Sequence, residues 1–203
     1  KIENQISEIN SNRNKYLLQV ECLEKMNCYL QKLDGVSQLQ ELMGYEGLAA
    51  KAYFAAHFNN VVWKGRKPRI KSDYVNSVLD IGYTMLFSYI DALLMCFGFD
   101  TYCGFLHKQF YMRKSLTCDI IEPFRVIIDH EIKKAINLRQ IKQEDFIVIN
   151  NQFRLKYVEN PKYIKFLMSP IIENKEEIFE YVQQFYRSFM KGNSITEYPR
   201  YRW

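Results

Sequence analysis

The sequence predicts a mainly α-helical protein that forms one domain over its 203 residues. Apolar residues recur at three- and four-residue steps along most of the chain, which is the period of a helix with one buried face. The chain has only eight Gly and five Pro, too few for the many turns of a β-sandwich or barrel. Hydrophobic residues make up 48% of the chain and charged residues 25%, as expected of a folded protein with its own core.

The first half of the chain contains three predicted helices. The first runs from Ile2 to about Lys32 and ends where Asp34-Gly35 interrupts the apolar pattern. The second opens at Ser37, which we interpret as its N-cap. The third extends from Tyr74 to about Phe97, and Gly98 stops it.

The second half combines further helices with one hairpin. Two β-branched runs flank Asn150-Asn151, a dipeptide that tolerates the left-handed backbone of a tight turn, so a small hairpin is expected near residues 146–155. Pro161 and Pro170 are expected to interrupt the helical pattern around them. The predicted helices of this half are Asp119–Leu138, Leu155–Leu167 and Lys175–Met190.

Composition excludes several classes of protein. No run of about 18 apolar residues is present and residues 1–30 lack the pattern of a signal peptide, so neither a membrane span nor a signal peptide is expected. The net charge of +5 is a mild excess that does not by itself indicate a nucleic-acid partner. The cysteines are odd in number and form no C-x-x-C pair, which predicts reduced, mostly buried thiols of an intracellular protein and no structural zinc site. They are Cys22, Cys28, Cys96, Cys103 and Cys118.

Glu46 does not suit an ordinary apolar helix face. Its neighbours at helical steps are Leu42, Met43, Ala49 and Ala50, so the carboxylate points to the apolar side of its helix. A buried carboxylate needs a positive partner, because burial without one costs several kcal/mol. That partner is either a metal ion or an arginine, and the pattern leaves both open.

His107 and the pair Asp119 and Glu122 are further candidates for a metal centre. His107 follows Gly104-Phe105-Leu106, where a histidine is either a hydrogen-bonded core residue or a ligand. Asp119 and Glu122 share a helix face and can present two carboxylates to one cation. They also resemble a capping box at a helix start, which Pro123 supports because proline is tolerated in the first turn.

Basic residues gather in two places and predict contacts with DNA phosphates. One is the loop from Trp63 to Asp73, and the other lies between His107 and Asp119, where aromatic residues flank the charges. A solvated loop is the simpler interpretation of the first. The tail 198–203 alternates aromatic and basic residues, which suits base stacking, docking on another subunit, or a disordered end. The predicted DNA-binding residues are Lys64, Arg66, Lys67, Arg69, Lys71, Arg113 and Lys114.

Four motifs in this order resemble the helical catalytic domain of the CRISPR-associated integrase family, Cas1. The resemblance covers roughly residues 37–146 and fades in the last fifty or so. The motifs are Gly44-Tyr45-Glu46-Gly47 with AAKAYF after it, RKPR (66–69) followed by Asp73-Tyr74-Val75-Asn76 and Gly82-Tyr83, then Gly104-Phe105-Leu106-His107, and Ser115-Leu116 with Asp119-Ile120-Ile121-Glu122-Pro123-Phe124-Arg125.

The resemblance implies a metal-dependent DNA endonuclease and integrase that inserts spacers into a CRISPR array by 3′-hydroxyl attack on a phosphodiester. It implies that Glu46, His107 and Glu122 bind one Mg²⁺ or Mn²⁺ ion, with Asp119 as a supporting carboxylate. The implied partners are a prespacer duplex and a CRISPR repeat, a second copy of the chain or a higher homo-oligomer, and the small Cas2 subunit, in the prokaryotic cytoplasm. Family members usually carry an N-terminal β-rich domain, which residues 1–203 do not show.

Two other functions compete with this one. A DNA-binding or architectural helical protein would bind DNA in a salt-sensitive way without metal-dependent strand chemistry. A helical scaffold would assemble with partners and bind no DNA. A di-iron bundle is excluded, because it needs paired Glu-x-x-His motifs and none occurs.

Overall fold

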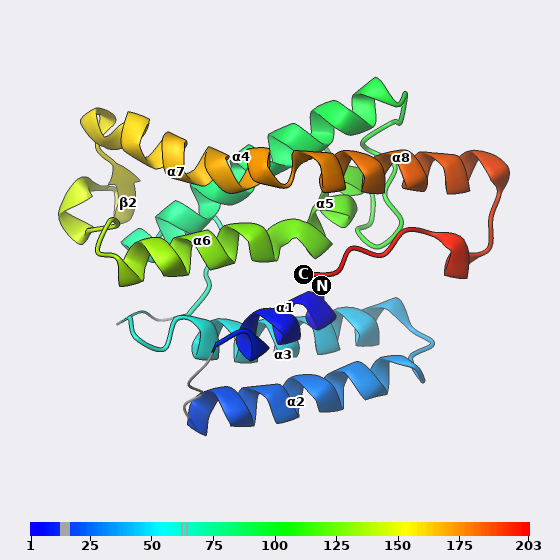
Figure 1. The fold of residues 1–203 in the computed structure, drawn as a ribbon, viewed down its shortest axis with the longest axis horizontal. Coiled ribbons are helices and arrows are strands. Elements are labelled where there is room, and N and C mark those ends of the chain that lie inside the picture. Colours follow the sequence, from blue (N-terminus) through cyan, green and yellow to red (C-terminus); the bar gives the residue numbers. More distant parts are fainter. Residues whose placement is uncertain (13–16, 62, 64) are drawn as a thin grey trace.

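The computed structural model describes residues 1–12, 17–61, 63 and 65–203 (Figure 1). These residues are mainly helical and include one two-stranded antiparallel hairpin, which confirms the fold class predicted from the sequence. The elements are α1 (Ile2–Asn10), α2 (Leu17–Leu33), α3 (Leu39–His57), α4 (Tyr74–Cys96), α5 (Ser115–Ile121), the 3-10 turn η1 (Glu122–Phe124), α6 (Arg125–Asn137), the 3-10 turn η2 (Gln143–Asp145), β1 (Phe146–Ile149), β2 (Gln152–Leu155), the 3-10 turn η3 (Tyr157–Glu159), α7 (Asn160–Glu173), α8 (Lys175–Lys191) and the 3-10 turn η4 (Ile195–Glu197).

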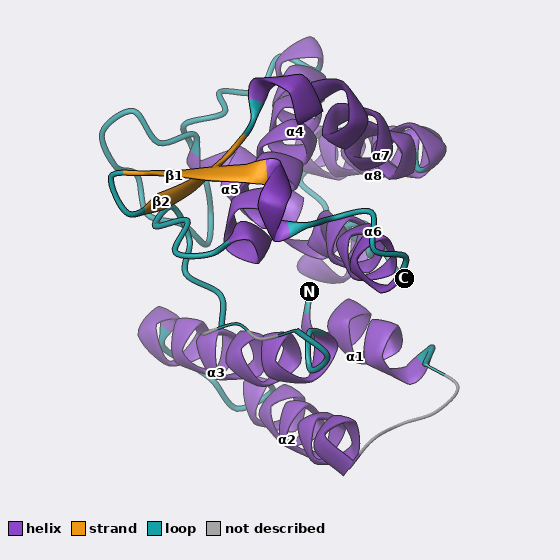
Figure 2. Ribbon diagram, turned by 90° about the vertical axis from the view of Figure 1, so that its left-hand side faces the viewer, coloured by secondary structure: helices purple, strands orange, loops and turns teal. Residues whose placement is uncertain are grey.

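The helices form two groups that lie one above the other in both views (Figures 1 and 2). Helices α1, α2 and α3 pack together as one group, and α4 to α8 with the hairpin form the other. Helix α1 joins the groups, because it contacts α2 and α3 on one side and α6 on the other. This seam between the groups is where the candidate site lies.

The prediction of one helix from Ile2 to Lys32 is wrong, because α1 ends at Asn10 and α2 folds back to pack beside it. The side chains of Ser11 and Asn12 donate hydrogen bonds of 2.8 and 3.2 Å to carbonyls of the preceding turn. Short polar side chains that bond their own backbone compete with helix continuation, and this local chemistry outweighs the apolar periodicity. Residues 13–16 lie outside the described part of the chain.

The second predicted helix is α3, but its start differs from the prediction. Gln38 is the N-cap, with extended backbone and no hydrogen bond from its side chain, so the assignment of Ser37 as N-cap is wrong. The helix is stabilised by burial of one face against the core and not by a capping side chain. Its buried residues include Ala49, Tyr53, Phe54 and His57.

Helix α4 is the central core helix and matches its prediction closely. The Asp73 side chain caps it by accepting a 2.7 Å hydrogen bond from the backbone N–H of Asn76. Gly98 ends it with a left-handed φ of 80°. In the described part of the chain α4 alone is long and apolar enough to cross a membrane, but it packs against α5, α6, α7 and α8, as a core helix does.

The predicted helix from Asp119 to Leu138 is wrong at its start and in its continuity. Helix α5 begins at Ser115, so Asp119 lies inside it and is not an N-cap, which rules out the capping box with Glu122. Pro123 lacks a backbone N–H, and the chain tightens there into the 3-10 turn η1 before α6 resumes.

The predicted hairpin is confirmed, with Phe146 paired to Leu155 and Ile149 to Gln152. Asn150 and Asn151 both have positive φ, 52° and 60°, the backbone that a type I′ hairpin turn requires.

Beyond the hairpin, the two prolines do not interrupt helices as predicted. Pro161 stands in the first turn of α7, where proline is tolerated, and Pro170 is accommodated inside the same helix. Helix α7 begins at Asn160 rather than Leu155, because the preceding residues belong to the hairpin and the turn η3.

All five cysteines are free thiols, as predicted, but the expectation that most are buried is wrong. Only Cys22 is buried, Cys118 is half-buried, and Cys28, Cys96 and Cys103 are exposed.

The aromatic tail packs on the chain's own helices. The Tyr201 ring lies 4.4 Å from the Phe124 ring, between centroids, and the Trp203 indole N–H donates a 2.8 Å hydrogen bond to Glu8 on α1. These contacts argue against the disordered end that the sequence left open, and roles in base stacking or subunit docking stay untested predictions.

Candidate active site

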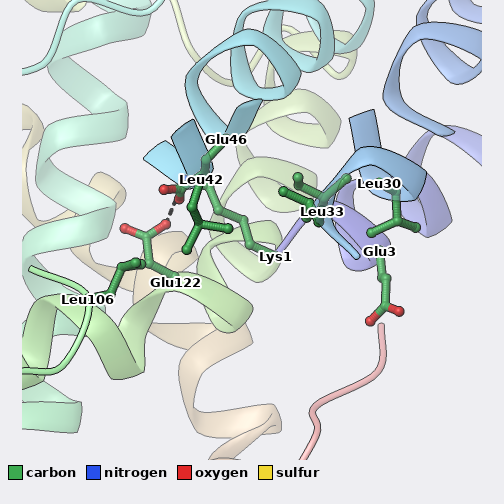
Figure 3. Close-up of a pocket in the computed structure, with 9 residues that line it drawn as sticks. Lys1, Glu3, Leu30, Leu33, Leu42, Glu46, Leu106 and Glu122 are labelled. Carbon is green, nitrogen blue, oxygen red and sulfur yellow. Dashed lines mark hydrogen bonds and ion pairs between the residues drawn. The ribbon is translucent and has the colours of Figure 1, made fainter. Parts of the chain in front are cut away.

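Glu46 and Glu122 meet across the seam between the two helix groups (Figure 3). Glu46 comes from the middle of α3, and Glu122 stands at the junction of α5 and η1. The Lys1 ammonium lies 2.7 Å from Glu46 Oε1 and 2.7 Å from Glu122 Oε2. One cation therefore bridges two carboxylates that are 76 positions apart in the sequence.

The partner of Glu46 is thus Lys1, and the arginine considered from the sequence pairs with Glu122 instead. Arg125 Nη2 lies 2.9 Å from Glu122 Oε1, one helical turn further along. Burial alone would raise the pKa of Glu122, but Arg125, Lys1 and the nearby His107 outweigh it and lower that pKa. Glu122 is consequently held as a carboxylate, the form that binds cations.

His107 is positioned by Asp119. The fully buried Asp119 carboxylate accepts hydrogen bonds of 2.7, 3.0 and 3.0 Å from the backbone N–H groups of residues 105, 106 and 107. Its Oδ1 atom also lies 2.5 Å from His107 Nδ1. A carboxylate oxygen accepts hydrogen bonds, so in a neutral imidazole this contact places the proton on Nδ1 and leaves the lone pair of Nε2 for a ligand.

Gly104 makes this arrangement sterically feasible. A Cβ atom at Gly104 would lie 2.7 Å from Asp119 Oδ2 and 2.7 Å from the Ser115 carbonyl carbon. Only a residue without a side chain lets the loop pass this close to α5, so the glycine of the motif is explained by the position of Asp119.

The donor set suits a hard divalent cation, although the described residues do not gather three such side chains at metal-binding distances. Glu122 Oε2 is buried and lacks a hydrogen bond of acceptable geometry, even though the Lys1 ammonium is near. Glu46 and His107 remain partly open, with side chains 22% and 15% exposed. Carboxylate oxygens and one imidazole nitrogen fit Mg²⁺ or Mn²⁺.

The structure places the predicted DNA-binding residues unevenly. Arg66 is bound to Asp80 at 2.6 Å and to Asn76 at 3.1 Å, and its guanidinium lies over the Tyr83 ring. Lys114 is bound to Asp91 at 2.6 Å. These two cations anchor loops to α4, so their role in contacting phosphate stays a prediction. Lys64 lies outside the described residues.

The remaining basic residues of the prediction lie in irregular backbone. Arg69 and Lys71 have positive φ values of 68° and 50°, and the Lys71 carbonyl accepts a 2.9 Å hydrogen bond from the backbone of β2. The backbone N–H of Lys67 donates to Asn76. The loop thus has fixed anchor points on α4 and β2, and DNA contacts by Lys67, Arg69, Lys71 and Arg113 remain untested predictions.

Sequence reasoning missed Lys1 and gave Arg125 no role of its own. The spacing of Arg125 three residues after Glu122 is an ordinary helical ion-pair signal and was available in the sequence. Lys1 gave no such signal, because its contacts depend on how α1 packs against α3.

A second polar cluster lies in the core next to the candidate site. We call Glu8, His57, Tyr83, Asp129 and His130 the core cluster. Tyr83 donates a short hydrogen bond to Asp129, His57 Nε2 lies 3.1 Å from the Asp129 carbonyl, and His130 Nδ1 lies 3.1 Å from Glu8. Burial lowers the pKa of His57 to about 4 and raises that of Asp129 to about 7.

Fold and site together define a mainly helical protein with a carboxylate and histidine centre at the seam of two helix groups. Residues 1–167 match the family described as CRISPR associated protein Cas1. The chain belongs to this family, as its motifs predicted.

The curated relatives include Cas1 proteins of two bacteria, Francisella tularensis and Thermus thermophilus. The CRISPR-associated endonuclease Cas1 1 of Francisella tularensis subsp. novicida is 29% identical over 183 residues, which are 81% of this chain and 57% of that protein. The endonuclease Cas1 3 of Thermus thermophilus is 31% identical over 147 residues, 70% of this chain and 44% of that protein. The chain therefore spans about half the length of these relatives.

A solved structure shares the fold over nearly the whole chain. A chain of a partial Cas6-RT-Cas1–Cas2 complex superposes with a TM-score of 0.89 and 23% identity, covering 99% of this chain and 65% of that one. The solved structure of a Cas1 protein from Thermotoga maritima superposes with a TM-score of 0.83 and 21% identity, covering 96% of this chain and 63% of that one. The helical architecture described above is therefore a Cas1-like fold.

Proposed function

We propose that this chain is the helical catalytic domain of a divalent-metal-dependent DNA endonuclease and integrase that inserts spacer DNA into a CRISPR array. The observation that carries the proposal is the pair of carboxylates, Glu46 and Glu122, that face one cation at 2.7 Å each. Membership of the Cas1 family and relatives named as endonucleases support it.

In this proposal the Glu46 and Glu122 carboxylates and His107 Nε2 hold Mg²⁺ or Mn²⁺. An ion held there would supply Lewis-acid polarisation of the scissile phosphate and of the attacking 3′-hydroxyl. Asp119 fixes the tautomer and direction of His107, and Arg125 keeps Glu122 ionised and oriented. The reaction exchanges one phosphodiester for another, so no nucleotide hydrolysis has to drive it.

The proposed substrate is a prespacer duplex with free 3′-hydroxyls, joined to a CRISPR repeat in the prokaryotic cytoplasm. Integration of two ends favours a homodimer or a higher homo-oligomer. The fold match to a chain of a complex that contains Cas2 supports a Cas2 partner.

The test is strand joining with a labelled short duplex and a supercoiled target in Mg²⁺, Mn²⁺ or EDTA. We expect joining or nicking with either metal and none with EDTA. Glu46→Ala and His107→Ala are expected to abolish the reaction. Glu41→Ala, an exposed carboxylate five positions earlier on the same helix, is the matched control and should leave it unchanged.

DNA binding that persists while every metal leaves the DNA intact would contradict the proposal and favour a non-catalytic architectural protein. Wild-type joining by Glu46→Ala would instead show that the carboxylate pair is structural.

A further inference from the structure

Arg125 has two carboxylates as helical neighbours and pairs with one of them. Glu122 stands three positions before it and Asp129 four positions after it, and both spacings place side chains next to each other on a helix. Arg125 Nη2 lies 2.9 Å from Glu122 Oε1, whereas within the described residues no ion pair joins Arg125 to Asp129. Asp129 Oδ2 is buried and has no hydrogen-bond partner there, so this acid still has an unused acceptor. Spacing permits either pair, and another feature must select between them.

The Tyr83 side chain separates Arg125 from Asp129. The guanidinium carbon of Arg125 lies 4.8 Å from the centre of the Tyr83 ring, over its face. The hydroxyl at the other end of this side chain donates a short hydrogen bond to Asp129 Oδ1. The face of an aromatic ring attracts a cation, so the ring holds the guanidinium while its hydroxyl serves the acid.

The close approach of α4 to α6 fixes the Tyr83 ring in this place. Gly82 precedes it on α4, and a Cβ atom at Gly82 would lie 2.5 Å from Ile128 Cγ2 on α6. Any side chain at Gly82 would push α4 away from the helix that carries Arg125 and Asp129. Tyr83 is also buried, so its ring has little freedom to turn away. The ring position is therefore set by the packing of two core helices.

We propose that Tyr83 is a positioning residue of the candidate active site, whose ring keeps Arg125 on Glu122 and away from Asp129. Without Tyr83, Asp129 loses its hydrogen-bond donor, and a buried acid without a partner is unfavourable. Arg125 then turns to Asp129, and Glu122 loses the cation that orients it. This inference rests on the proposed function and adds to its site a residue that acts through Arg125.

The first experiment measures Mn²⁺ binding to the DNA-free chain by calorimetry, with thermal melting to follow stability. Tyr83→Leu removes the ring and should weaken Mn²⁺ binding by about tenfold, as the loss of an outer partner of a metal ligand does. Tyr83→Phe keeps the ring and should bind Mn²⁺ as tightly as the wild type. The matched control is Tyr163→Leu, because Tyr163 is also fully buried and donates a 2.8 Å hydrogen bond to an acid, Asp145, on another part of the core. The control should lower stability and leave Mn²⁺ binding unchanged.

A second change should rescue the loss. Adding Asp129→Asn to Tyr83→Leu removes the acid that competes for Arg125, so Mn²⁺ binding should return towards the wild-type value. A tyrosine with only a general packing role would not be rescued in this way, because the second variant restores no packing.

The second experiment needs neither metal nor activity. The NMR signal of the Arg125 Nε–H group, assigned by its loss in Arg125→Lys, reports whether the ring covers the guanidinium. The face of an aromatic ring shifts the signal of a proton above it to lower frequency. We expect this shift in the wild type and in Tyr83→Phe, and its loss in Tyr83→Leu. If Tyr83→Leu does not fold, the wild type and Tyr83→Phe still decide.

The inference is overturned if the wild-type Arg125 signal is unshifted, or if Tyr83→Phe loses Mn²⁺ binding. It is also overturned if folded Tyr83→Leu binds Mn²⁺ as the wild type does, if Tyr163→Leu weakens binding equally, or if Asp129→Asn brings no rescue. Where the wild type joins strands in metal, these results leave the proposed function standing. A wild-type chain that neither binds Mn²⁺ nor joins strands contradicts the proposed function, and with it the role of Tyr83 at a metal site.

Discussion

The candidate active site and the core cluster use the same kinds of side chain, yet their physical states differ. At the candidate site Glu46 and His107 stay partly open to solvent, and Glu122 is held ionised by neighbouring cations. In the core cluster His57 and Asp129 are fully buried, and burial favours the neutral form of both. Carboxylates and imidazoles become candidate ligands where cations and water reach them, and hydrogen-bonded core groups where neither does.

Arg125 stands between the two regions and belongs to both. Its guanidinium binds Glu122 at 2.9 Å and lies 4.8 Å from the centre of the Tyr83 ring, whose hydroxyl binds Asp129. The cation thereby lowers the pKa of an acid at the site, while the acid behind Tyr83 stays substantially protonated. The difference between the two regions can be tested by substitutions that replace one carboxylate oxygen with an amide nitrogen.

The largest expected effect comes from Glu122→Gln set against Asp129→Asn. Glu122→Gln removes a proposed metal ligand charge and should lower the rate of strand joining by about 10³-fold, because metal stabilisation of the transition state amounts to several kcal/mol. Asp129→Asn keeps the acceptor for Tyr83 and should leave the rate nearly unchanged. Single-turnover rates of strand joining in Mn²⁺ measure the effect of each variant. Equal losses in the two variants would contradict the distinction between the candidate site and the core cluster.

A smaller loss is expected for Asp119→Asn. The amide still fills the space but cannot accept all the hydrogen bonds that hold the His107 loop, and it no longer fixes the imidazole tautomer. Outer partners of metal ligands usually change affinity or activity by about 10- to 100-fold. Mn²⁺ titration followed by joining rates checks this, and a loss as complete as that of His107→Ala would mean that Asp119 binds metal directly.

The core cluster predicts a pH effect on stability. The folded pKa of His57 is about 4, below the ordinary value of 6.5, so the unfolded chain binds more protons between these values. The contribution of neutral His57 to stability is therefore full above pH 6.5 and is lost as pH falls towards 4. We expect His57→Gln to cost about 1–2 kcal/mol more at pH 7 than at pH 5.

Urea unfolding of the wild type and His57→Gln at both pH values measures this difference. A cost that is the same at pH 5 and pH 7 would show that His57 titrates normally in the folded chain.

The smallest expected effect concerns Lys1. Its ammonium lies between the two carboxylates and repels a divalent cation that approaches them. Lys1→Gln should tighten Mn²⁺ binding by roughly fivefold, since unit charges about 4 Å apart in a watery medium interact by about 1 kcal/mol. Calorimetric titration tests it, and weaker binding would indicate that Lys1 organises the site.

Prediction from the sequence succeeded where the signal was local. The turn at Asn150-Asn151 and the helix stop at Gly98 follow from the backbone preferences of those residues. Prediction failed where the periodicity of apolar residues was the only signal used and other interactions outweighed it. At the end of α1, for example, the side chains of Ser11 and Asn12 bond the backbone of the preceding turn.

For the candidate site, the sequence predicted the residues but not the contacts that join them. The motifs identified Glu46, His107, Asp119 and Glu122, and the structure joins them in two pairs through Lys1 and the His107 loop. Whether these residues bind a metal stays a prediction. The ion pairs of Lys1 with two carboxylates and the burial of His57 depend on contacts between distant segments, which no spacing in the sequence encodes.

The sequence separation of the contact between Trp203 and Glu8 leads us to expect that it forms late in folding. It closes a loop of 195 residues, so its entropic cost is met only after most of the chain is in place. Trp63, by contrast, packs its ring edge-on against Phe54 and Phe58, within ten positions of itself. The two tryptophans of the chain should therefore report two stages of folding. Trp63 fluorescence follows an early local collapse, and Trp203 fluorescence follows the final docking of α1.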